Sequence, residues 1–132
     1  MRGSSKRKTK TRRLLRQACS LALAAALACA ACAGPERPLL EQFFAASRLR
    51  DRTALQKIST TIFEPRARGI VRQFEIVKVV PRADGSRRDV TIVAPVATPD
   101  GRTVQETLDV SLERDAGGRW IVTAVNESGS RP

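Results

Sequence analysis

Two kinds of hydrophobic spacing divide the chain after residue 38. From there to about residue 62, apolar side chains recur every three or four positions, which predicts helices. We expect one helix over residues 39–50, and a second helix that Asp51 caps and Pro65 ends. The apolar stripe of the first helix contains Leu40, Phe43, Phe44 and Ala46, and that of the second contains Leu55, Ile58 and Ile62.

From residue 70 onward, apolar and polar residues alternate, which is typical of half-buried strands. The pattern predicts four strands, over residues 70–80, 89–95, 104–112 and 120–125, with Gly-containing turns between them. The residues expected to point inward are Phe74, Ile76 and Val80 in the first strand, Val90, Ile92 and Ala94 in the second, and Val104, Leu108, Val110 and Leu112 in the third.

Helices followed by strands joined through short turns predict an α+β domain. Its sheet would be antiparallel, with about four strands and with two N-terminal helices packed on one face. No segment shows the strand–helix–strand alternation that a parallel sheet requires.

The first 33 residues have the organisation of an export signal. Seven basic residues lie before residue 14, and the first acidic residue is Glu36. A positive segment of this kind stays on the cytoplasmic side of the membrane. The apolar run over residues 18–33 is rich in alanine and shorter than the roughly 20 residues that span a bilayer. We therefore expect a cleaved signal peptide and not a permanent membrane helix.

All three cysteines, Cys19, Cys29 and Cys32, lie in this leader. Disulfides, the usual use of cysteine in an exported domain, are therefore excluded for the rest of the chain. The run over residues 30–34, in which small residues surround Cys32, resembles the lipobox of bacterial lipoproteins. That resemblance implies a diacylglyceryl thioether on Cys32, cleavage before it, and acylation of the new amino terminus. Two or more acyl chains hold a protein stably at a membrane.

Two features of the leader leave alternatives open. A lipobox usually has leucine three places before the modified cysteine, where this chain has Cys29, and Cys29 is itself the alternative lipid site. Cleavage after the sequence Ala-Cys-Ala would instead give a plainly secreted protein. Residues 11–15, TRRLL, partly resemble a twin-arginine signal, so the general secretory and twin-arginine routes both stay open.

The leader and its cysteine divide the chain into four segments. We expect a cleaved signal peptide over residues 1–31, a Gly- and Pro-containing tether over residues 32–38, a folded domain over residues 39–126, and a tail over residues 127–132. A protein processed in this way would be anchored to the membrane of the bacterial cell envelope and face the periplasm or the exterior.

Most of the excess positive charge belongs to the leader. The net charge of +11 by itself suggests nucleic acid as a partner. Eight of the 24 basic residues lie before residue 17, however, and the other 16 nearly balance the 13 acidic residues of the remaining chain. Because the signs alternate there, we expect no nucleic-acid partner unless the leader stays on the mature protein.

The residue types that most often carry catalysis are scarce. The sequence has no histidine, no tyrosine, and no thiol beyond the leader, which removes the commonest general base and metal ligand. Asp51 is expected to be a helix cap, and Asp89 and Asp109 are expected to face outward. We therefore expect no metal, no cofactor and no catalysis. A divergent isomerase or dehydratase with a buried carboxylate base is the alternative.

Three short sequences carry a resemblance to a known superfamily. They are Phe43-Phe44 in the first helix, DRTAL at residues 51–55 and GRWIV at residues 118–122. With the order of elements, they resemble the nuclear transport factor two-like (cystatin-like) superfamily, and in particular its small bacterial lipoproteins of unknown function. The resemblance implies a curved sheet that wraps the helices as a cone with a cavity at its open end. It also implies a range of functions, from isomerases and dehydratases to domains without chemistry.

Four aromatic residues are candidates for the lining of such a cavity. Phe43, Phe44, Phe74 and Trp120 would form an apolar pocket for a lipid or another small apolar ligand. The same residues would equally serve as the core of a small domain. We therefore expect a binding or scaffolding domain whose partners are the membrane, through the lipid anchor, and a protein or an apolar small molecule.

Overall fold

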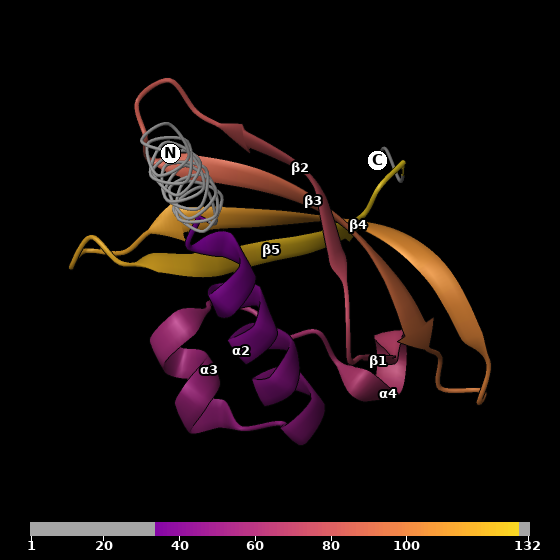
Figure 1. Cartoon of the computed structure of the whole chain (residues 1–132). Helices are drawn as coiled ribbons and strands as arrows, with labels where there is room; N and C mark the ends of the chain where they lie inside the picture. The colour runs from indigo at the N-terminus through magenta and orange to yellow at the C-terminus, as the bar shows by residue number, and fades with distance from the viewer. Residues whose placement is uncertain (1–33, 130–132) are drawn as a thin grey trace, which may run out of the picture. The chain divides into compact units, whose positions relative to one another are not determined.

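The computed structural model describes residues 34–129 and shows an α+β domain with an antiparallel sheet, as predicted (Figure 1). The export signal and the candidate lipid sites Cys32 and Cys29 lie outside the described residues. No helix among residues 34–129 is long and apolar enough to cross a membrane. The elements, in chain order, are α2 (Glu36–Leu49), α3 (Arg52–Ile58), α4 (Pro65–Arg68), β1 (Ile70–Val71), β2 (Glu75–Pro81), β3 (Arg87–Ala97), β4 (Thr103–Arg114) and β5 (Trp120–Glu127).

Strand β3 is the centre of the sheet, and every strand pair is antiparallel. One edge of β3 pairs with β1 near its C-terminal end and with β2 along much of its remaining length. The other edge pairs with β4, which in turn pairs with β5. The sheet is curled, and α2 and α3 lie on the same side of it (Figure 1).

The core lies between α2 and the inner face of the sheet, which is the face toward the helices. Each large side chain buried there contributes about 1.5–3 kcal/mol. The fully buried strand residues are Val90, Ile92, Ala94 and Val96 of β3, Leu108, Val110 and Leu112 of β4, and Val122 of β5. Those in β3 and β4 confirm the predicted inward residues. Val104 also lies on the inner face, since it pairs with the buried Val96, but it is 41% exposed near the start of β4.

Helix α2 starts earlier than the sequence pattern predicted. Residues 36–38, assigned above to the tether, form its first turn, with Pro35 as the N-cap residue. Proline is tolerated in a first helical turn, and a carboxylate there interacts favourably with the helix dipole. The Glu36 carboxylate is buried and forms an ion pair with Arg88 on β3, which fixes this turn against the sheet.

Helix α3 ends earlier than predicted. Asp51 does cap it, since its carboxylate accepts a hydrogen bond from the Ala54 backbone N–H at 3.0 Å. The helix stops at Ile58, however, and Ile62 lies outside it. The next residues, Ser59-Thr60-Thr61, are poor helix formers because hydroxyl and β-branched side chains compete with helical geometry. They run alongside β5 instead, where Thr60 N–H donates to the Val122 carbonyl at 2.9 Å.

The first predicted strand is divided in two by residues 72–74. Within β2, a register shift between Ile76 and Lys78 marks a β-bulge. Because side chains alternate with a period of two, one extra residue reverses the alternation beyond it. Ile76 therefore faces inward as predicted, but Val80 pairs with Asp89 on the outer face and is exposed.

The C-terminal boundary also differs from the prediction. Residue 127, expected to belong to the tail, continues β5 after residue 126 and pairs with Leu108. The Ser128 N–H then donates to the Thr107 carbonyl at 2.8 Å. Backbone hydrogen bonds to β4 thus hold the chain in place through residue 128.

Candidate functional site

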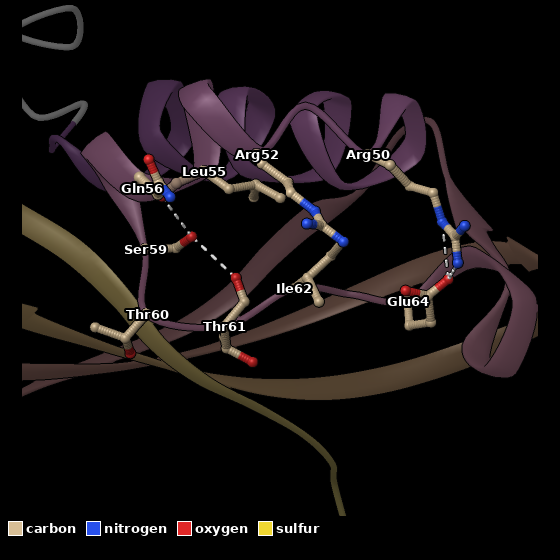
Figure 2. Close-up of a pocket in the computed structure, with 9 residues that line it drawn as sticks. All are labelled: Arg50, Arg52, Leu55, Gln56, Ser59, Thr60, Thr61, Ile62 and Glu64. Carbon is tan, nitrogen blue, oxygen red and sulfur yellow. Dashed lines mark hydrogen bonds and ion pairs between the residues drawn. The ribbon is translucent and has the colours of Figure 1, made fainter.

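A pocket of about 740 Å³ opens between α3 and the segment that follows it, residues 59–64 (Figure 2). We call it the α3 pocket. It exists because α3 ends at Ile58 and the chain turns away to run along β5. Its lining residues are Arg50, Arg52, Leu55, Gln56, Ser59, Thr60, Thr61, Ile62 and Glu64.

The floor of the α3 pocket is apolar and held in place from both sides. Leu55 is buried in the core, and Ile62 is half-buried against it. Next to Ile62, the buried Phe63 donates its backbone N–H to Ser47 Oγ on α2 at 3.2 Å. Together with the Thr60 hydrogen bond to β5, this contact fixes the segment that forms one wall.

Hydroxyl and amide groups form the polar part of the wall. Ser59 Oγ lies 2.9 Å from both the Leu55 and the Thr61 carbonyl oxygens, so its proton is engaged within the wall. Gln56 and Thr60 are exposed, and Thr61 is half-exposed. These three side chains offer hydrogen-bond donors and acceptors to a molecule in the pocket.

Three charged side chains set the electrostatics of the α3 pocket. Arg50 Nε donates to Glu64 Oε1 at 3.1 Å, and the two groups form an ion pair. This side-chain hydrogen bond lowers the pKa of Glu64 below its ordinary value, so the carboxylate stays ionised and offsets Arg50. Arg52 has no ion pair among residues 34–129. The pocket therefore carries one uncompensated positive charge.

Figure 2 shows the Arg52 side chain extending from the start of α3 across the pocket toward Ile62. A guanidinium group binds carboxylates and phosphates through two parallel hydrogen bonds. With Leu55 and Ile62 beneath it, this group can hold the charged head of a molecule whose remainder is apolar. The described residues contain no cluster of three or more His, Cys, Asp or Glu side chains that would hold a metal ion.

The structure separates the four aromatic residues expected to line an apolar pocket. Phe43 and Phe44 are buried, and the Phe44 ring contacts Phe43, Phe63 and Phe74 with centroids 5.2, 5.6 and 5.8 Å apart. This cluster is part of the core. None of the four lines the α3 pocket, and a lipid pocket lined by these aromatic residues stays a prediction.

Trp120 lies apart from that cluster, half-buried at the start of β5. The guanidinium carbons of Arg88 and Arg114 lie 5.0 and 4.5 Å from its ring centroid. Such cation–π contacts cover part of the ring surface with the arginine side chains. Trp120 therefore packs with charged side chains at the N-terminal end of β5.

Sequence reasoning missed the charged residues of the α3 pocket. Arg50 and Glu64 are 14 positions apart, and no helical or strand periodicity relates them. One signal was available, since three consecutive hydroxyl residues, Ser59 to Thr61, mark a break in the predicted second helix. That break predicts a change of direction, but the groups that meet there depend on packing.

Comparison of the chain with protein-family models, with curated proteins and with solved structures found no match. The assignment of function therefore depends on the leader and on the geometry of residues 34–129.

Proposed function

We propose that this protein is exported, carries a lipid anchor in the bacterial cell envelope, and uses its α+β domain as a non-catalytic binding module. The proposed ligand of the α3 pocket is a small anionic molecule with an apolar portion. The proposed lipid site is Cys32, with Cys29 as the alternative. We also propose that the curled sheet and its helices represent a cystatin-like cone, as in the small lipoproteins that the sequence resembles.

The leader supports the proposed location. Its basic segment, short apolar run and small residues around Cys32 are the features that export and lipid attachment require. A double or triple acyl anchor would place the domain next to a membrane, with residues 32–35 as the link to α2.

The observation that carries the proposed binding role is the uncompensated Arg52 above the apolar floor of the α3 pocket. Glu64 pairs with Arg50 and so leaves Arg52 available to a ligand. A charge-assisted hydrogen bond to a guanidinium is about twice as strong as a neutral one. The adjacent Leu55 and Ile62 add hydrophobic contact at roughly 25 cal/mol per Å² of apolar surface buried.

The binding role is tested by calorimetric titration of the purified exported protein with octanoate and octyl phosphate. We expect both to bind, and we expect Arg52→Ala to weaken binding by about tenfold or more, which corresponds to about 1.4 kcal/mol. Octanol, which lacks the charge, should bind much more weakly. Arg72→Ala is the matched control, because Arg72 is exposed and does not line the pocket. Equal affinities in the Arg52 and Arg72 variants would refute the proposed site.

The anchor is tested separately, by growing cells that express the full chain in radiolabelled palmitate. We expect the label to enter the protein and to be lost in Cys32→Ser but kept in Cys29→Ser. Label that persists in Cys32→Ser and disappears in Cys29→Ser would move the lipid to Cys29. An unlabelled wild-type protein would reject lipid attachment and favour plain secretion.

A further inference from the structure

The outer face of the sheet, opposite the helices, carries a groove of about 1000 Å³ that involves β2, β3, β4 and β5. We call it the outer groove. It lies on the other side of the sheet from the core and from helices α2 and α3. Residues 127–129 contribute part of its lining. The proposed binding of an anion by the α3 pocket does not involve this surface.

The strand register places one polar side chain from each of four strands in a single row. Lys78 pairs with Thr91, Thr91 pairs with Asp109, and Asp109 pairs with Asn126. Directly paired residues point to the same face of a sheet, and all four line the outer groove. At about 4.8 Å between neighbouring strands, the row is roughly 14 Å long. It presents an ammonium, a hydroxyl, a carboxylate and an amide in that order.

A second row lies beside the first, since Val80 pairs with Asp89 and Asp89 pairs with Ser111. Its polar side chains form a network with Arg87. Arg87 Nε donates to Asp89 Oδ1 at 3.0 Å, and Arg87 Nη2 donates to Ser111 Oγ at 3.0 Å. Ser111 Oγ in turn donates to Asp89 Oδ1 at 3.2 Å. These contacts hold the side chains of the second row in fixed positions before any ligand binds.

The two aspartates keep acceptor capacity. Thr91 Oγ1 donates to Asp109 Oδ1 at 2.7 Å, which orients that carboxylate. Within the described residues, the side-chain hydrogen bonds of Asp89 and Asp109 all use Oδ1. Each Oδ2 is therefore left to accept from water or from a ligand that displaces it.

The chemistry of the groove favours a ligand rich in hydroxyl groups. Its two cations, Lys78 and Arg87, are balanced by the carboxylates of Asp89 and Asp109, so the groove has no excess of positive charge to attract a phosphate chain. A hydroxyl group both donates and accepts, and so it can satisfy a carboxylate on one side and an ammonium or amide on the other. The length of the polar row suits a linear chain of several such units.

We infer that the outer groove binds a neutral oligosaccharide laid across the strands. The inference is independent of the α3 pocket, because the two surfaces share no lining residue. Asp109 would accept hydrogen bonds from the ligand near the middle of the row, and Lys78 and Asn126 would contact it toward the two sides. The exposed Val80 offers the apolar C–H face of a sugar ring a surface to pack on.

The inference is tested by titrating the purified protein with three neutral tetrasaccharides: cellotetraose, chitotetraose and maltotetraose. Binding is measured by NMR or calorimetry. We expect at least one to bind, with amide shifts concentrated at residues of the two rows. Asp109→Ala and Asn126→Ala should each weaken binding by about tenfold. Asn126 is exposed near the end of β5, so its variant keeps the test valid if Asp109→Ala is unstable.

Gln105→Ala is the matched control, because Gln105 is exposed on β4 and lies outside the groove. It should leave the affinity unchanged, as should Arg52→Ala in the α3 pocket. Absence of binding by all three sugars would overturn the inference. So would equal affinity in the Asp109, Asn126 and Gln105 variants. Binding of spermine alone, abolished by salt, would identify the groove as a weak cation site and also overturn it.

Discussion

In β3, Val90 and Ile92 are fully buried against the helical side, whereas Asp89 and Thr91, their neighbours in the chain, line the outer groove. The same contrast continues in β4. Two surfaces with opposite chemistry are thus made by alternate residues of the same strands, separated only by the thickness of the backbone.

The two faces differ in what a substitution should do. On the inner face, each side chain touches many others, so removing atoms leaves a cavity that the surroundings fill only in part. On the outer face, side chains contact water and each other through hydrogen bonds worth about 1 kcal/mol each. We conclude that the inner face stabilises the fold, and that the outer face is free to hold a ligand because stability depends on it much less.

The largest effect should come from truncating adjacent residues on opposite faces. Ile92→Ala should lower the free energy of unfolding by about 2–5 kcal/mol, since Ile92 is fully buried. Thr91→Ala should lower it by about 1 kcal/mol or less, through loss of its hydrogen bond to Asp109. Urea denaturation of the two variants measures both values, and equal losses would contradict the contrast between the faces.

The second prediction concerns the point where the chain meets the end of β3. Gly69 has φ +95°, and a Cβ built there would lie 2.4 Å from the Ala97 carbonyl oxygen. Gly69→Ala should therefore cost about 2–3 kcal/mol, from backbone strain and from displacement of β3.

Gly101→Ala separates these two causes. Gly101 has φ +89°, but no atom lies within 4 Å of the position its Cβ would take. This variant should show only the cost of the left-handed backbone, about 1–2 kcal/mol. A Gly69→Ala variant no less stable than Gly101→Ala would show that the clash is relieved without cost.

A smaller effect is expected where a charge interrupts the inner face. Arg88 lies in an inward row with Pro81 and Leu112, and its guanidinium pairs with the buried Glu36 of α2. Glu36→Gln should cost about 1–2 kcal/mol, because it leaves Arg88 with a weaker, uncharged partner in a mostly buried site.

Helix α2 provides the matched control for that variant. Glu41 lies in the same helix and pairs with Arg37 at 4.0 Å, with both side chains exposed. Exposed pairs contribute about 0–1 kcal/mol, so Glu41→Gln should have almost no effect on unfolding. If both glutamate variants unfolded at the same urea concentration, the proposed contribution of the Glu36 ion pair would be wrong.

The smallest effect is expected in the turn between β4 and β5. The Asp115 carboxylate accepts the Arg119 and Gly117 backbone N–H groups at 2.9 Å each, and chiefly the first of these lowers the pKa of Asp115 below its ordinary 3.8. A carboxyl group with a lowered pKa in the folded state stabilises the protein at pH values above its ordinary, unfolded-state pKa. This contribution is lost as the pH falls through the folded-state pKa.

Urea unfolding between about pH 6 and about pH 2.5 measures that contribution. We expect the wild-type protein to lose stability on acidification and Asp115→Asn to lose less, since an amide does not titrate. Parallel pH profiles for the two proteins would show that Asp115 does not contribute.

Much of the fold was predictable because its signals are local. Alternation in β3 and β4 identified the inward residues, and Asp51 identified the start of α3. The errors in the predicted fold arose where a local irregularity interrupted the strand alternation or ended a helix early. The bulge at residue 77 reversed the side on which Val80 lies, and the early end of α3 removed Ile62 from its helix.

Both candidate sites were less predictable than the fold. Asp89 and Asp109 were expected to face outward, and they do, but alternation does not say which residues of neighbouring strands lie side by side. The α3 pocket was even less predictable from the sequence. Its opposite walls are α3 and residues 59–64, and their relative position depends on how the chain turns after α3.

The sequence by itself determined the alternation of apolar and polar residues, the turns and the helix cap, because each depends on residues close together in the chain. The tertiary structure decided which polar groups meet. The row of Lys78, Thr91, Asp109 and Asn126 requires the register of three strand pairs. The exposure of Arg52 to a ligand requires the pairing of Arg50 with Glu64. Both depend on packing between distant segments, which local sequence patterns do not encode.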